Sequence, residues 1–212
     1  MLAYDAEVYF SLIGQYNADI WPAQLVSWAL GLVALFLVFR PSRTSSIIIG
    51  MILGACWLWT GIAFHWFAFA PLNFAAPVFA GLFIMQAALV GIIIFRKRNL
   101  RFQYAPTASG IAGLILLAIA LGAYTVTGPL FGIALEQSPM FGVSSQTTVL
   151  FTLGMLLLAQ PHTPWVLAII PLLWSFYTGA VAWFLAIPQD FALPAAGLLM
   201  LALGVVVKGR ET

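Results

Sequence analysis

Seven apolar stretches, each about long enough to cross a lipid bilayer, follow one another along this chain with short segments between them. A membrane-spanning helix needs roughly 20 mostly apolar residues. Charged residues make up only 7% of the chain, whereas a soluble domain carries about 25% and uses them to cover its surface. We therefore expect an all-α integral membrane protein in one compact bundle. The expected spans are 21–39, 47–70, 74–95, 108–131, 144–160, 165–187 and 191–207.

The charged residues are divided unequally between the two sides that seven spans would create. All 8 Lys and Arg residues would lie on one side, and every acidic residue except Glu211 on the other. Because Lys and Arg are retained in cytoplasmic loops, this division predicts an outside N-terminus and a cytoplasmic C-terminus. An even number of spans would scatter the arginines over both faces.

The segment before the first span has its own pattern. In residues 1–20, apolar side chains from Tyr9 to Ile20 recur at helical spacing, with acidic and amide residues elsewhere on the helical wheel. This pattern predicts an amphipathic helix on the outer membrane surface; the alternative is a frayed tail. One membrane domain, 21–207, and a cytoplasmic tail, 208–212, would follow.

One proline-rich phrase occurs twice. APLNFAAPVF at 70–79 and IPQDFALPAA at 187–196 align at an offset of 117 residues, which also pairs tryptophans in the preceding spans. The echo predicts a duplicated three-helix unit, in parallel orientation, joined by the fourth span. The alternative is two unrelated tight turns with proline at the next helix start. The predicted units are repeat one (21–95), a linker helix (108–131) and repeat two (139–207).

His65 is an ionisable residue near the outer end of the second span. Burial of such a group is expensive unless it faces a partner or water, so an intramembrane histidine suggests function and would suit proton coupling. Asp190, Asp19 and Glu136 are the candidate charge partners on the same side. The alternative is a neutral histidine in the aromatic belt beside Trp66.

The fifth span has the most polar entrance of all the spans. Clustered hydroxyls and amides at a helix N-terminus favour anions or polar groups, although a well-capped helix start is the simpler alternative. Proline breaks at the ends of neighbouring spans free backbone groups that need partners or water. We therefore expect one outward-facing polar vestibule between the repeats. Its expected members are His65, Asn73, Gln86, Ser144, Ser145, Gln146, Thr147, Thr148 and Asp190.

Several kinds of site are not expected. His65 and His162 lie at opposite membrane faces, which excludes a bis-histidine haem, and no span contains a lysine for a retinal Schiff base. A single cysteine, Cys56, excludes a cysteine metal cluster. We expect no metal, no cofactor and no nucleic-acid partner, and nothing in the sequence favours an enzyme.

Four motifs, YNADIWPAQ (16–24), FHWFAFAPLN (64–73), FGVSSQTTVLFTLG (141–154) and IPLLW (170–174), resemble a bacterial multipass membrane-protein family known only as a domain of unknown function. The resemblance implies a bacterial inner-membrane protein and no particular activity. It also implies a Cys-Pro step where this chain has Ser145 and Gln146, so a thiol role for this loop is not expected. The three-one-three repeat plan is similar to that of small sugar transporters at the level of the fold only.

Three functions remain open from the sequence. The first is a small permease or channel for a polar or anionic solute that passes between the repeats. The second is a non-catalytic subunit that docks another membrane protein, a lipid or a second copy of the chain. The third is a lipid-modifying enzyme at the outer face, which would rest only on His65 and the acidic residues.

Overall fold

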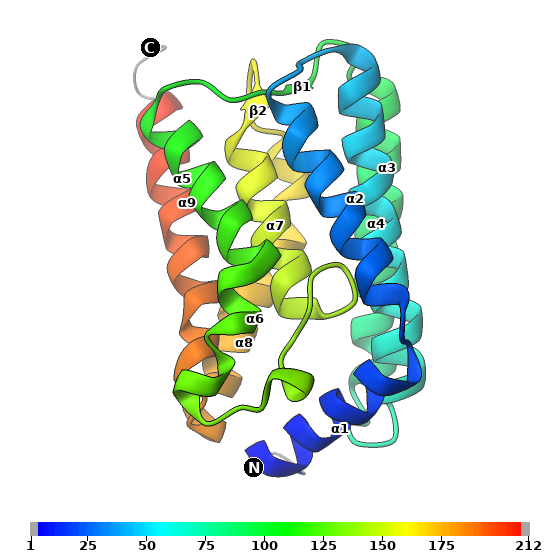
Figure 1. Ribbon diagram of the computed structural model, residues 1–212. Helices are drawn as coiled ribbons and strands as arrows, with labels where there is room; N and C mark the ends of the chain where they lie inside the picture. Colours follow the sequence, from blue (N-terminus) through cyan, green and yellow to red (C-terminus); the bar gives the residue numbers. More distant parts are fainter. Residues whose placement is uncertain (1–3, 209–212) are drawn as a thin grey trace.

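Helices dominate the computed structural model, which describes residues 4–208 (Figure 1). Most of the expected tail, 208–212, lies outside the described residues. Two helices continue into π-helical turns, at Thr60–Phe69 and Ile119–Ala123. The α-helices are α1 (Ala6–Asp19), α2 (Ala23–Val38), α3 (Arg43–Trp59), α4 (Ala76–Arg96), α5 (Ala108–Ala118), α6 (Tyr124–Val126), α7 (Ser145–Leu157), α8 (Ile169–Leu185) and α9 (Ala192–Lys208). The short strands β1 (Arg101–Phe102) and β2 (Ala159–Gln160) pair antiparallel.

Among the described residues, four helices are long and apolar enough to cross a membrane. A fifth candidate arises if α1 and α2, which are bent by 88° to one another, count as one broken span. The expected all-helical fold is confirmed, and four to five helices suited to crossing a membrane are consistent with the expected membrane protein. The expected number of seven spans stays a prediction. The four helices are Arg43–Phe69, Ala76–Arg96, Ala108–Val126 and Trp165–Leu185.

The helices start where the sequence offers caps. The Ser42 side chain accepts a hydrogen bond from the backbone N–H of Ser45, and Thr107 caps α5 in the same way. Such caps satisfy N–H groups that have no partner within the helix. The Arg43 guanidinium donates to the carbonyl of Ile94 at 2.6 Å. The start of α3 is therefore held against the end of α4, at the same end of the bundle as β1 (Figure 1).

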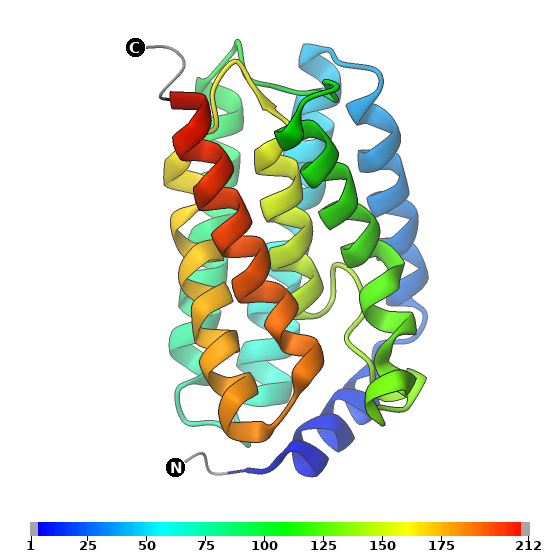
Figure 2. The same cartoon turned by 90° about the vertical axis from the view of Figure 1, so that its left-hand side faces the viewer.

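Helix α7 is the centre of the bundle, with α3, α5, α8 and α9 packed around it (Figures 1 and 2). Every one of its 13 residues is buried. Its closest neighbour is α5, where a Cβ on Gly154 would lie 2.9 Å from the carbonyl oxygen of Gly113. Small residues let two membrane helices approach this closely. Helix α2, by contrast, buries only one face, which includes Gly31 and Ala34.

A buried, non-helical segment, residues 138–144, leads into α7. Irregular backbone survives inside a membrane protein only when its polar groups find partners. Here five backbone carbonyls each accept a hydrogen bond from a side chain. The donors are Asn17 to Ser138, Thr125 to Pro139, Thr147 to Met140, Ser27 to Phe141 and Tyr16 to Val143, at 2.6–3.1 Å. These five hydrogen bonds stabilise the irregular backbone of the segment.

Helix α1 lies across the end of the bundle opposite the strands (Figure 1). Asp5 caps it by accepting from the N–H of Val8 at 2.9 Å. Tyr9, Ile13 and Tyr16 are buried against the bundle, while Asp5 and Asp19 are exposed. A helix with one apolar face is thus present where the sequence indicates one, and its apolar face packs on protein.

Candidate functional site

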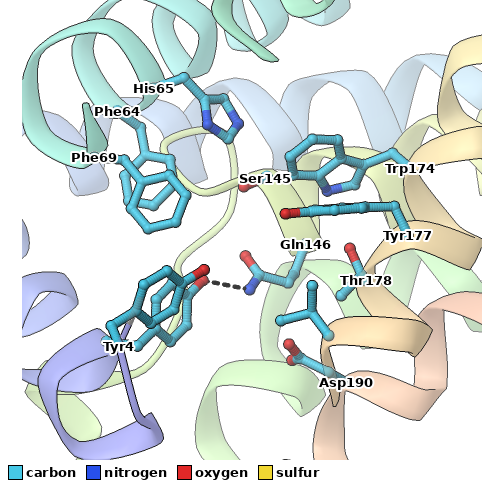
Figure 3. A pocket seen from close by; sticks show the side chains of 12 residues that line it. Tyr4, Phe64, His65, Phe69, Ser145, Gln146, Trp174, Tyr177, Thr178 and Asp190 are labelled. Atoms are coloured by element: carbon cyan, nitrogen blue, oxygen red, sulfur yellow. Dashed lines mark hydrogen bonds between the residues drawn. The ribbon is translucent and has the colours of Figure 1, made fainter. Parts of the chain in front are cut away.

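A small pocket lies where α1, the π-helical turn Thr60–Phe69, α7, α8 and the turn before α9 meet (Figure 3). Its volume is about 30 Å³. We call it the His65 pocket. Polar and aromatic side chains from distant parts of the chain point into it, and they include Tyr4, Tyr9, His65, Phe69, Ser145, Gln146, Trp174, Tyr177, Thr178 and Asp190.

His65 is completely buried and is surrounded by aromatic rings. Its ring centroid lies 4.6 Å from that of Phe83 and 5.0 Å from those of Phe64 and Trp174, and two more rings lie within 6.1 Å. Neither ring nitrogen has a hydrogen-bond partner within the described chain. Because such a group costs about 1–3 kcal/mol when it is left unsatisfied, the imidazole needs a partner from outside the chain.

Two further unpaired atoms belong to residues that line the same pocket, the indole Nε1 of Trp174 and the amide Oε1 of Gln146. The Gln146 amide is oriented by its Nε2, which donates to the Tyr9 hydroxyl at 2.7 Å. A neutral imidazole offers one donor and one acceptor, an indole one donor, and an amide oxygen one acceptor site here. The pocket therefore presents two unpaired donors and two unpaired acceptors.

Asp190 is the one acidic residue that lines the pocket, and only 4% of its surface is exposed. The Tyr124 hydroxyl donates to its Oδ1, and Gln189 donates to the backbone carbonyl of Tyr124. Burial raises the pKa of the Asp190 carboxyl to about 6, although hydrogen bonds from Tyr124 and Gln146 oppose this effect. Its protonation therefore changes near neutral pH.

Tyr4 lines the pocket (Figure 3), and its ring centroid lies 6.1 Å from that of Tyr9, another lining residue. Burial and, to a smaller extent, the nearby Tyr177 raise the pKa of the Tyr4 hydroxyl to about 12, although a hydrogen bond from Asn73 opposes the shift. This places Asn73 next to the rim. The Asn73 Oδ1 also accepts from the N–H of Ala75 at 2.9 Å, which stabilises the turn between the second and third expected spans.

Four of the expected vestibule residues, His65, Ser145, Gln146 and Asp190, line the pocket. The remaining ones do not. Gln86 donates to the carbonyl of Leu167 at 2.8 Å and ties α4 to the turn before α8.

The other polar residues near the start of α7 have local roles. Ser144 and Thr147 hydrogen-bond the backbone of Met140, and Thr148 lies 3.5 Å from the hydroxyl of Thr60 in the core. The two further charge partners expected for His65, Asp19 and Glu136, are exposed and do not line the pocket. Of the three acidic candidates, only Asp190 shares the pocket with His65.

The aromatic members of the pocket were missed in the sequence. Tyr4, Tyr9 and Tyr177 are typical of membrane interfaces, so their presence near span ends carries no signal of its own. Trp174 stood out only as the residue 117 positions after Trp57 and as the end of the IPLLW motif. Its unpaired indole nitrogen depends on packing that sequence periodicity does not describe.

The residues that line the pocket bear on the charge that a ligand could carry. Within residues 4–208, no group of three His, Cys, Asp or Glu side chains is placed to hold a metal ion. Among the described residues, no Lys or Arg lines the pocket. A bound anion would therefore have the Asp190 carboxyl beside it and no cationic side chain to offset its charge.

Of three comparisons with known proteins, only the comparison with protein-family models gives a match. No curated protein matches the chain, and no solved structure matches it either. A family model with the description "Family of unknown function (DUF6064)" matches residues 6–211. This match covers nearly the whole chain and agrees with the expected domain of unknown function, so the protein belongs to DUF6064, a family of unknown function.

Proposed function

We propose that this protein is a small permease for an uncharged polar solute and that the His65 pocket is its binding site in a closed state. The observation that supports this most strongly is the set of four buried, unpaired polar atoms on His65, Trp174 and Gln146. They come from three separate helical segments and line one pocket. Structural polar groups are normally paired within the protein, so this concentration favours a ligand.

The balance of the four atoms favours an uncharged solute. Two donors and two acceptors match water, urea, small amides or short alcohols, each of which carries both kinds of group. An ammonium ion would leave the indole donor of Trp174 unpaired. An anion would be repelled by the Asp190 carboxylate at neutral pH. The anionic solute considered from the sequence is therefore the less favoured alternative.

The size of the pocket also limits the proposal. A cavity needs roughly 10–15 Å³ to hold one water molecule, so about 30 Å³ accommodates one or two. A larger solute requires the pocket to open. Tyr4 and Tyr9, from the N-terminal segment, line it. We propose that a shift of this segment admits a solute, from the outer side in the proposed topology.

The membrane topology is part of the same proposal. We propose seven spans, with the N-terminus outside, in a bacterial inner membrane. Each of the seven apolar stretches contains a helix, although α2 and α7 have only 16 and 13 residues. The basic loops around Arg43 and Arg101 lie at the strand end of the bundle, opposite α1, which supports a cytoplasmic strand end.

The internal repeat is likewise a proposal, and burial at the 117-residue offset supports it. Trp57 and Trp174 are both buried, as are Asn73 and Asp190. The following pairs, Trp66 with Trp183 and Phe67 with Phe184, are all exposed. The first helices of the two units differ, because α2 exposes one face and α7 is wholly buried. In this proposal the two units keep the same proline-rich turn, but the first helix of the second unit, α7, lies at the centre of the bundle, whereas the first helix of the first unit, α2, lies at its surface.

The test is solute entry into proteoliposomes, measured by stopped-flow light scattering during swelling. Purified protein should accelerate entry of urea or glycerol relative to empty liposomes. Trp174→Phe removes the unpaired indole donor and should slow entry, whereas the matched change Trp183→Phe, on the same helix but 77% exposed, should leave it unchanged. Equal rates for protein and empty liposomes with every solute would oppose the permease and favour the membrane-subunit alternative.

A further inference from the structure

A second pocket, which we call the kink pocket, lies at the sharp bend between α1 and α2. It has a volume of about 230 Å³ and is lined by Asn17, Gln24, Trp21, Glu136 and their neighbours. Asn17 and Gln24 are only 6% and 5% exposed, while Trp21 and Glu136 are exposed and open the pocket to the surface. Nothing in the proposed solute pathway uses these residues.

Each buried amide in the kink pocket has one unpaired atom, and in each case it is the oxygen. The Nδ2 of Asn17 donates to the carbonyls of Glu136 and Ser138, at 2.9 and 3.1 Å. The Nε2 of Gln24 donates to the backbone carbonyl of Asn17 at 2.6 Å. An amide turned the other way would set oxygen against carbonyl oxygen, so both orientations are fixed. Asn17 Oδ1 and Gln24 Oε1 are left as acceptors without a donor.

We infer that the kink pocket binds a primary ammonium group. The unpaired atoms of the His65 pocket are donors and acceptors in equal number, whereas those of the kink pocket are acceptors only. A primary ammonium has three N–H donors and no acceptor, so it matches two amide oxygens and leaves a donor for the Glu136 carboxylate. The exposed indole of Trp21 adds an aromatic face, which attracts cations.

The place of the pocket in the fold identifies sources for this group. It lies at the start of α2, at the bundle end that carries α1, where a span meets the headgroup layer in the proposed topology. An aminophospholipid such as phosphatidylethanolamine presents a primary ammonium at that depth, and a free amine supplies the same chemistry from solution. Phosphatidylcholine has the same charge but no N–H group, so a comparison of the two lipids separates the effect of hydrogen-bond donation from the effect of charge.

The experiment is native mass spectrometry of the purified protein with equimolar phosphatidylethanolamine and phosphatidylcholine. We expect phosphatidylethanolamine to be favoured by about tenfold or more, because phosphatidylcholine cannot donate the charge-assisted hydrogen bonds that a primary ammonium makes. Free ethanolamine is then added. If ethanolamine displaces the lipid, the primary ammonium group alone is sufficient for binding. If the lipid stays bound, the rest of the lipid is also needed, and the ligand is the whole lipid.

Two pairs of variants check the assignment. Gln24→Met removes one acceptor and should abolish the preference, whereas Gln15→Met, at an exposed position of α1, should keep it. If Gln24→Met does not fold, Glu136→Gln at the surface should still lower the preference about two- to fivefold, with Glu7→Gln as its control. Equal binding of the two lipids by the native protein, with no thermal stabilisation by ethanolamine, would overturn the inference.

Discussion

Replacement of His65 by phenylalanine tests whether this residue binds a solute or stabilises the fold. The imidazole makes no hydrogen bond to the described chain, and five aromatic rings surround it. A phenyl ring keeps these ring contacts and removes both nitrogens. The change therefore removes the polar interaction with a solute while keeping most of the packing.

The expected magnitudes differ for flux and for stability. A solute that meets phenyl instead of imidazole leaves its own polar groups unpaired, which costs about 1–3 kcal/mol and lowers flux by about 5- to 150-fold. The folded protein loses no internal hydrogen bond, because neither nitrogen has one. The larger phenyl ring destabilises the fold by at most about 1–3 kcal/mol through overpacking. The removal of the two unpaired ring nitrogens offsets this cost.

The assay compares swelling rates of proteoliposomes and thermal unfolding in detergent for the native protein and His65→Phe. We expect a large loss of flux and a melting temperature close to the native value or above it. A variant that melts far earlier would refute the reasoning, because it would mean that the nitrogens have a structural partner. If flux and melting temperature were both unchanged, His65 would not contact the solute, and the proposed binding role would be wrong.

Three further predictions concern charge, packing and topology. The folded protein raises the pKa of Asp190 from 3.8 to about 6, so the stability contributed by its protonated form is fully present below pH 3.8 and is lost as the pH rises through 6. In thermal melts, Asp190→Asn should therefore be more stable than the native protein by about 2–3 kcal/mol at pH 8 and equally stable at pH 3. Gly154→Ala places a Cβ 2.9 Å from a carbonyl oxygen and should destabilise by about 1–3 kcal/mol in the same melts, whereas Gly81→Ala, with no atom within 4 Å, should not. In intact cells, an impermeant thiol reagent should label Gln137→Cys and not Ser42→Cys; the reverse pattern would contradict the outside N-terminus.

The overall class of the fold was readable from the sequence because membrane helices satisfy their backbone internally. Apolar length alone therefore located the helices at Ile47–Ala70 and Phe74–Phe95, close to the observed Arg43–Phe69 and Ala76–Arg96. The buried non-helical segment 138–144 was not foreseen. Its stability depends on side chains such as Tyr16 and Ser27, which are more than 100 residues away in sequence.

The candidate site was only partly readable. His65 and Asp190 stood out because ionisable groups are rare in such a chain, and both line one pocket. Ser144 and Thr147 looked equivalent to Gln146 in sequence, yet they bond the local backbone while Gln146 reaches Tyr9. Which polar residue caps a helix and which faces a pocket depends on the direction of the side chain, and a run of five polar residues contains no information about that.

Chemical accessibility of Thr178 is the most direct test that the His65 pocket is reached from outside. Thr178 lines the pocket, whereas Ser175, less than one turn earlier on α8, bonds the carbonyl of Pro171 and is not among the lining residues. In intact cells, a small impermeant thiol reagent should modify Thr178→Cys and spare Ser175→Cys, and a permeant solute such as urea should slow the reaction. Failure of both cysteines to react, or equal reaction of both, would contradict an outward-opening solute pocket.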